Sequence, residues 1–216
     1  MTAAVRPDDA DGLAAAVETL RAGGLLVLPT DTVYGVAVAL DTPGGVERLF
    51  AAKHRPAEKA IIVLVDGLDQ VAGIVELPPA AAVLARVGWP GGLTLVLPLA
   101  DPARLPPALT AGTETLGVRV PDHPTPRALA RALGPLPTTS ANRSGDPPAL
   151  DAAEAMGALG DEVDLILDGG VSAGGVASTV VDCTGPRPSI IRAGAISAEV
   201  LAAALDGAGV AHAIGC

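Results

Sequence analysis

The sequence contains almost no lysine and almost no aromatic side chains. Lys53 and Lys59 are its only lysines, and Trp, Tyr and Phe occur once each in 216 residues. The chain has 24 acidic residues against 14 basic ones, which gives a formal net charge of -10. Tight binding of RNA or DNA through many phosphates usually needs a basic face, so this charge argues against that class of function. A small phosphorylated ligand needs only a few well-placed donors and remains compatible with it.

Cysteines and long apolar runs are scarce as well. Cys183 and Cys216 supply neither a disulfide framework nor a zinc site, and we expect Cys183 to be an inert thiol of the core. The three histidines lack metal-ligand spacing, so we expect no metal site built from protein side chains. The apolar runs fall far short of the roughly 20 residues that a spanning helix needs. No basic-then-apolar segment opens the chain, so we expect a cytoplasmic protein without membrane contact.

Helix and strand patterns alternate irregularly along the chain. Asp8 or Asp9 can cap a helix that ends at Gly23-Gly24, and Thr42-Pro43 can open a helix that runs to about Ala52. Further helices are predicted over 78–87, 125–133, 151–159 and 197–205, and strands over 25–28, 33–40, 61–65, 93–97, 115–120, 163–167, 178–182 and 189–192. Several strands follow one another directly, which favours a mixed sheet over a parallel one. No linker interrupts the pattern, so we expect one domain over residues 1–216.

The usual signatures of nucleotide and hydrolase sites are absent. There is no phosphate-binding loop, no Gly-x-Gly-x-x-Gly after the first strand, and no Gly-x-Ser-x-Gly around Ser140. Polar clusters occur instead at 30–35, 53–59, 138–145 and 174–180. Each cluster alone could equally be a turn or a helix cap. Together they supply hydroxyls and glycine-exposed amides that suit carboxylate or phosphate oxygens. The compensating charge would come from five cations in and beyond these clusters: Lys53, Arg55, Lys59, Arg119 and Arg192.

Seven segments, in order along the chain, resemble the signatures of the YrdC-like family, the threonylcarbamoyl-AMP synthases. They are Pro29–Gly35, Lys53–Pro56, Trp89–Thr94, Gly117–Pro121, Ser140–Gly145, Ser178–Asp182 and Ile191–Gly194. The resemblance covers a core of about residues 8–205. Four residues depart from the usual pattern: Leu64 replaces a frequent histidine, Gly92 a frequent proline, Pro148 an occasional serine, and Ala193 the proline of Arg-Pro-Gly.

The resemblance implies an α/β (mixed α+β) domain, in which a twisted mixed sheet flanked by helices carries a large positively charged cavity. No C-terminal accessory domain is expected. The implied reaction is that of a nucleotidyltransferase, which joins ATP, L-threonine and bicarbonate into threonylcarbamoyl-AMP and releases pyrophosphate. Mg2+ accompanies the ATP. The product would pass to the tRNA threonylcarbamoyl-transferase machinery for N6-threonylcarbamoyladenosine at position 37 of ANN-decoding tRNAs, with weak or indirect tRNA binding.

The resemblance also assigns residues to the two substrates. The predicted ATP-binding residues are Lys53, Arg55, Lys59, Thr115, Ser140, Asn142 and Arg192. The predicted L-threonine-binding residues are Thr32, Arg119, Thr138 and Ser178. No residue is identified as the general base. The alternative is a YrdC-like RNA-binding protein without adenylation activity; a hydrogenase-maturation carbamoyltransferase would need acylphosphatase-like and zinc-finger segments that this chain does not contain.

Lys53, Arg55 and Lys59 give a first prediction. They stand beside a single acid, Glu58, and could either neutralise triphosphate or simply end a solvated helix. If Arg55 makes a charge-assisted contact in the transition state, Arg55→Ala should lower adenylate formation by about two orders of magnitude with little change in melting temperature. A variant that melts several degrees lower but keeps near-normal turnover would show that the cluster is structural.

Overall fold

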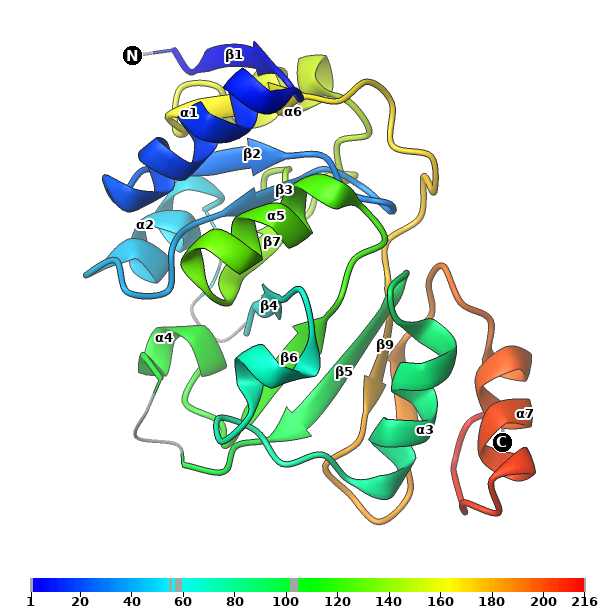
Figure 1. Cartoon of the computed structure of the whole chain (residues 1–216). Helices are drawn as coiled ribbons and strands as arrows, with labels where there is room; N and C mark the ends of the chain where they lie inside the picture. The colour runs from blue at the N-terminus through cyan, green and yellow to red at the C-terminus, as the bar shows by residue number, and fades with distance from the viewer. Residues whose placement is uncertain (1, 55, 57–59, 102–104, 216) are drawn as a thin grey trace.

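The computed structural model describes residues 2–54, 56, 60–101 and 105–215. Helices pack around a twisted sheet in which all the strands of these residues take part (Figure 1). The strands are β1 Ala4–Pro7, β2 Leu26–Leu28, β3 Gly35–Ala37, β4 Ile62–Leu64, β5 Leu93–Pro98, β6 Thr115–Arg119, β7 Leu136–Ser140, β8 Leu165–Asp168, β9 Thr179–Asp182 and β10 Ser189–Arg192. The helices are α1 Ala10–Arg21, α2 Gly45–Ala52, α3 Pro79–Gly88, α4 Pro107–Thr110, α5 Pro124–Leu133, α6 Ala152–Leu159 and α7 Ala198–Gly207, with a 3-10 turn, η1, at Leu68–Val71.

The sheet is mixed, as the irregular alternation of elements predicts. Its strand order is β1-β8-β2-β3-β7-β4-β6-β5-β9-β10. Four neighbouring pairs are parallel (β1 with β8, β8 with β2, β4 with β6, β5 with β9) and the other five are antiparallel. Strands distant in sequence therefore meet in the middle, where β3, β7, β4 and β6 lie side by side.

Both faces of the sheet are covered in its middle, which explains why short inner strands such as β2 and β3 are buried throughout, whereas the edge strand β1 is exposed. In β2, Leu26 and Leu28 belong to a cluster with Leu20 of α1 and Leu129 of α5, whereas Val27 belongs to a larger cluster on the opposite face. Successive side chains of a strand point to opposite faces, so this alternation separates the two cores. Helices α1 and α5 lie on the near face in Figure 1.

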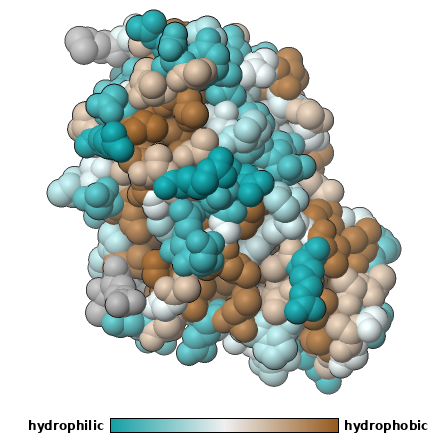
Figure 2. Space-filling model, viewed as in Figure 1, coloured by the Kyte–Doolittle hydropathy of each residue, from teal (hydrophilic) through white to brown (hydrophobic). Residues whose placement is uncertain are grey.

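On the near face, charged side chains gather around α5. Figure 2 shows a hydrophilic band across the middle of this face, with apolar surface below it. Asp66, just after β4, accepts hydrogen bonds from Arg127 Nε and Arg131 Nη1, both at 2.7 Å. The hydrogen bonds from Arg131 and Arg127 lower the pKa of Asp66. These partly exposed pairs add little stability, but they tie the end of β4 to α5.

Most of the predicted elements are confirmed, but two predicted boundaries are wrong. Asp9 caps α1, and its side chain accepts a hydrogen bond of 2.9 Å from Gly12 N. Thr42, in contrast, is not an N-cap, because α2 begins at Gly45 after Gly44 in a left-handed conformation. The predicted strand 33–40 shrinks to β3, since the preceding residues form a turn around the Thr30 hydroxyl.

Four elements escaped the sequence prediction: β1, β7, η1 and α4. Strand β1 is exposed along its length and shows no apolar alternation. Strand β7 contains Pro137 and three hydroxyl residues, so its composition resembles a loop. It becomes a strand because β3 and β4 pair with it on both sides.

Two smaller expectations concern the core and the membrane. Cys183 is 1% exposed, and burial raises the pKa of its thiol to about 12, which confirms an inert core cysteine; Cys216 lies outside the described residues. Across the described ranges, no helix combines the length and the apolar character that a membrane crossing requires.

Candidate anion-binding site

A cavity of about 380 Å³ lies over the middle strands of the sheet. Side chains from β4, β6, β7 and β10 and from the turn before β3 line it. The structure brings together eight of the predicted site residues in this lining: Thr32, Thr115, Arg119, Thr138, Ser140, Asn142, Ser178 and Arg192. Their convergence follows from the strand order, because segments up to 160 positions apart end beside one another.

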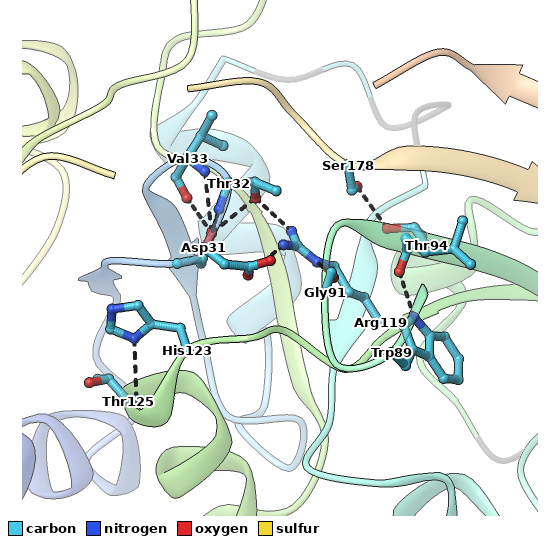
Figure 3. Close-up of polar contacts among 12 residues, drawn as sticks. Asp31, Thr32, Val33, Trp89, Gly91, Thr94, Arg119, His123, Thr125 and Ser178 are labelled. Atoms are coloured by element: carbon cyan, nitrogen blue, oxygen red, sulfur yellow. Dashed lines mark hydrogen bonds and ion pairs between the residues drawn. The ribbon is translucent and has the colours of Figure 1, made fainter. Parts of the chain in front are cut away.

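Arg119 is the most strongly held residue of the cavity (Figure 3). Its Nε donates to Gly91 O at 2.9 Å, Nη1 to Thr32 Oγ1 at 2.8 Å, and Nη2 to Asp31 Oδ1 at 2.6 Å. Burial lowers the pKa of Arg119, and the charge and hydrogen bond of Asp31 oppose this effect. The three contacts use three of its five N–H groups, so one hydrogen on each Nη is left for a ligand.

The turn that holds Thr32 and Asp31 is built by one hydroxyl. Thr30 Oγ1 accepts hydrogen bonds from Thr32 N at 3.1 Å and Val33 N at 3.3 Å, and donates to Val33 O at 2.7 Å. Such side-chain contacts with nearby backbone groups compete with strand formation. The turn fixes the Thr32 hydroxyl 3.0 Å from Thr30 Oγ1 and within reach of Arg119.

Arg192 differs from Arg119 in its partners. Its Nε and Nη2 donate to Ser178 O at 3.2 and 2.8 Å, and Nη2 also donates to Ser178 Oγ at 3.1 Å. These are neutral acceptors, and no carboxylate of the described residues pairs with it. Partial burial lowers the pKa of the Arg192 guanidinium. Arg192 is nevertheless an exposed residue that lines the cavity, so the N–H groups of its guanidinium can donate to an anionic ligand there.

The end of β7 and the segment after it form another part of the cavity wall. Ser140 Oγ donates to Asn142 Oδ1 at 2.5 Å, and Asn142 Nδ2 donates to the carbonyls of Arg143 and Asp146 at 2.8 and 2.7 Å. The Asn142 amide is thus fully engaged in shaping this wall. Ser140 and Asn142 still line the cavity, so this wall offers the Ser140 hydroxyl oxygen as an acceptor, and the Asn142 amide holds that hydroxyl in place.

Lys53 does not line the cavity, although it was predicted among the ATP-binding residues. It is 1% exposed, and its Nζ donates to the carbonyls of Ser140 and of Asn142, the latter at 2.5 Å. Ser144 N in turn donates to Lys53 O at 2.9 Å. The side chain lies behind the wall that Ser140 and Asn142 form, so the geometry favours a supporting role.

The other predicted residues are placed less decisively. Thr138 is buried and donates to Leu136 O at 2.8 Å, whereas Thr115 contacts Thr113 Oγ1 at 2.9 Å. Arg55 and Lys59 lie outside the described residues, so the strongly positive character of the cavity stays a prediction. Within the described lining, Arg119 and Arg192 face a single acid, Asp146.

Sequence reasoning missed several residues of the site. Asp31 stands inside a predicted motif but was not assigned a role. Thr94 was not singled out either, although a fully buried hydroxyl within the apolar strand β5 is a signal that could have found it. Asp146 carries no signal in the sequence, because a loop around Gly145 brings it to the cavity.

Two of the departures from the family pattern line the cavity, and a third has a steric reason. Leu64 and Pro148 are lining residues. A Cβ at Gly92 would lie 2.7 Å from Ala195 Cβ, closer than two carbons can approach, so glycine fits this position in this chain. No described contact explains Ala193.

A mixed α/β domain with two arginines and several hydroxyls around one cavity is typical of proteins that bind small anionic ligands. Comparison with known proteins identifies the family within this class. The Sua5/YciO/YrdC family profile, described as "Telomere recombination", matches residues 18–194. The chain therefore belongs to this family, as the seven motifs predict.

Relatives span most of the chain. A Mycobacterium tuberculosis protein is 40% identical over 195 residues, which cover 90% of this chain and 89% of that protein. A Chromohalobacter salexigens protein named threonylcarbamoyl-AMP synthase is 40% identical over 190 residues, 86% of this chain and 94% of that protein. The crystal structure of Pyrococcus abyssi Sua5 complexed with L-threonine superposes with a TM-score of 0.88 at 31% identity. It covers 98% of this chain, which spans only 61% of the Sua5 chain.

The position of Lys53 gives a prediction that separates support from ATP contact. Lys53→Met should lower the free energy of unfolding by about 2 kcal/mol, because buried carbonyls lose a charged donor. Denaturant unfolding measures this change. The control is Arg48→Met, which removes an exposed cation from α2, the helix that Lys53 follows, and should change stability little. Unchanged stability together with lost ATP binding would show instead that Lys53 contacts ATP.

Proposed function

We propose that the protein is a threonylcarbamoyl-AMP synthase, a nucleotidyltransferase that condenses L-threonine, bicarbonate and ATP and releases pyrophosphate. The observation that carries this proposal is the pair of arginines on one hydroxyl-lined cavity, one compensated by Asp31 and the other without a carboxylate partner. Several anionic groups must be held together in this reaction, and such an arrangement suits them. Membership of the family and the likeness to threonine-bound Sua5 support the assignment.

The residues that line the cavity can be divided between the two substrates. Thr32, Arg119, Thr138 and Ser178 would hold L-threonine, with the free N–H groups of Arg119 on its carboxylate. Ser140, Asn142, Thr115 and Arg192 would contact ATP, with Arg55 and Lys59 on its phosphates. The wall supported by Lys53 would position the nucleotide.

Mg2+ fits this site as a companion of ATP. Asp146 is the single carboxylate residue of the described lining, and no group of three or more metal-binding side chains gathers elsewhere in the described ranges. Mg2+ keeps several waters and is commonly held by one carboxylate plus substrate phosphates. When bound, it would neutralise charge that develops on the phosphates.

The chemistry requires positioning more than a covalent nucleophile. The unprotonated amine of threonine forms a carbamate with CO2 derived from bicarbonate. A carbamate oxygen then attacks the α-phosphorus of ATP, and the bond to the departing pyrophosphate breaks. In this scheme the arginines hold the anions in place and stabilise the charge that builds up in the transition state. We assign no general base.

The product is expected to pass to the machinery that modifies adenosine 37 of ANN-decoding tRNAs. A net charge of -10 makes direct, tight tRNA binding unfavourable, so contact with tRNA would be weak or indirect. Such a role places the protein in the cytoplasm.

The reaction itself is the main test. The purified protein should release pyrophosphate from ATP only when L-threonine and bicarbonate are both present, and mass spectrometry should detect the adenylate. Omission of each substrate in turn is the control. Salt-resistant RNA binding without adenylate formation would favour the RNA-binding alternative instead.

Arg119 provides a second test, directed at threonine. Lysine cannot reproduce the planar fork that contacts Gly91, Thr32 and Asp31 and still leaves paired N–H groups for a carboxylate. Arg119→Lys should therefore weaken L-threonine binding by about ten-fold or more, while ATP binding changes little. Calorimetry with each substrate separately measures both affinities, and an unchanged threonine affinity would remove Arg119 from the threonine site.

A further inference from the structure

Ser178 lies between two partners that together determine what its hydroxyl can do. It is 3% exposed and lines the cavity, and its Oγ lies 2.8 Å from Thr94 Oγ1 and 3.1 Å from Arg192 Nη2. A guanidinium can only donate, so Arg192 occupies one lone pair of Ser178 Oγ. The direction of the hydrogen bond with Thr94 then decides whether the Ser178 proton is available to a ligand.

Burial of Thr94 determines that direction. Thr94 is 0% exposed, and Ser178 Oγ is the one partner of its hydroxyl among the described residues. If Ser178 donated to Thr94, the Thr94 proton would be buried without an acceptor, which costs far more than a typical hydrogen bond contributes. Thr94 therefore donates to Ser178 and occupies its second lone pair.

We propose that Thr94 is a positioning residue that makes Ser178 an obligate donor into the cavity. With both lone pairs occupied, the Ser178 hydroxyl can offer only its proton, and the group that accepts it is an anionic oxygen of the substrate. This inference rests on the proposed function for the identity of that substrate, and assigns the Ser178 contact to the carboxylate of L-threonine rather than to its ammonium group. Figure 3 shows the Thr94–Ser178 contact beside the Arg119 cluster.

The arrangement also links the residues assigned to the two substrates. Arg192, proposed to contact ATP, and Ser178, proposed to contact threonine, share hydrogen bonds. Thr94 reaches the cavity only through Ser178, since it is absent from the lining. Because Ser178 Oγ is the partner of the Thr94 hydroxyl among the described residues, this hydroxyl acts on the ligand through Ser178.

Isosteric replacement tests this pathway. Thr94→Val keeps the shape and removes the hydroxyl, so the Ser178 proton is free to rotate and the dissociation constant for L-threonine should rise about ten-fold. Thr94→Ser, which restores the donor, should stay within about two-fold of the unchanged protein. Thr125→Val is the matched control, because Thr125 is also buried and hydrogen-bonded, to Asp8, but lies outside the cavity lining; its threonine affinity should not change.

A double-mutant cycle distinguishes an effect of Thr94 that acts through the Ser178 hydroxyl from a general disturbance of the structure around the site. Once Ser178→Ala has removed the hydroxyl, adding Thr94→Val should cause no further loss of threonine affinity. Fully additive losses, or a Thr94→Val protein that binds threonine normally, would overturn the proposal.

Neutron diffraction from crystals of the ligand-free protein in D2O provides a readout that does not depend on the proposed function. The deuterium of Thr94 should lie on the line to Ser178 Oγ, and that of Ser178 should point into the cavity. The reverse orientation would overturn the inference. If the protein binds no threonine at all, the proposed function fails, and the deuterium positions still decide how the two hydroxyls are oriented.

Discussion

The buried guanidinium of Arg119 is the contact on which the geometry of the site depends. It joins β6 to the turn before β3 and to the segment at Gly91, three parts of the chain that are far apart in sequence. A charge at this depth is stable only if it is paired and hydrogen-bonded, and Asp31 satisfies both conditions. The groups that compensate the charge of Arg119 also set its orientation, so the contacts that stabilise the guanidinium fix the direction of its remaining N–H groups.

The same arrangement occurs three times around the cavity: a supporting residue hydrogen-bonds a group that lines the cavity. Asp31 holds Arg119, Lys53 holds the wall at Ser140 and Asn142, and Thr94 holds Ser178. Each supporting residue is largely or fully buried, so its polar atoms are satisfied within the protein and not by the ligand. Such preorganisation lowers the reorganisation needed when charged substrates bind.

The distribution of charge fits a small-ligand enzyme better than a nucleic-acid binder. The chain is strongly acidic overall, yet two arginines line one cavity with a single acid among the described residues. Local cations in an acidic protein act at short range, because salt screens exposed charges beyond about 10 Å.

The sequence by itself determined the family, the mixed character of the sheet and eight polar residues of the cavity. Apolar periodicity, the cap at Asp9 and the seven ordered motifs are local properties, so they can be read without coordinates. Tertiary structure decided the rest. Strand β7 forms despite Pro137 because β3 and β4 pair with it, and Lys53 becomes a support because the fold buries it against the carbonyls beyond β7. Asp31 and Thr94 gain their roles from partners 88 and 84 positions away, and no local pattern encodes contacts at that separation.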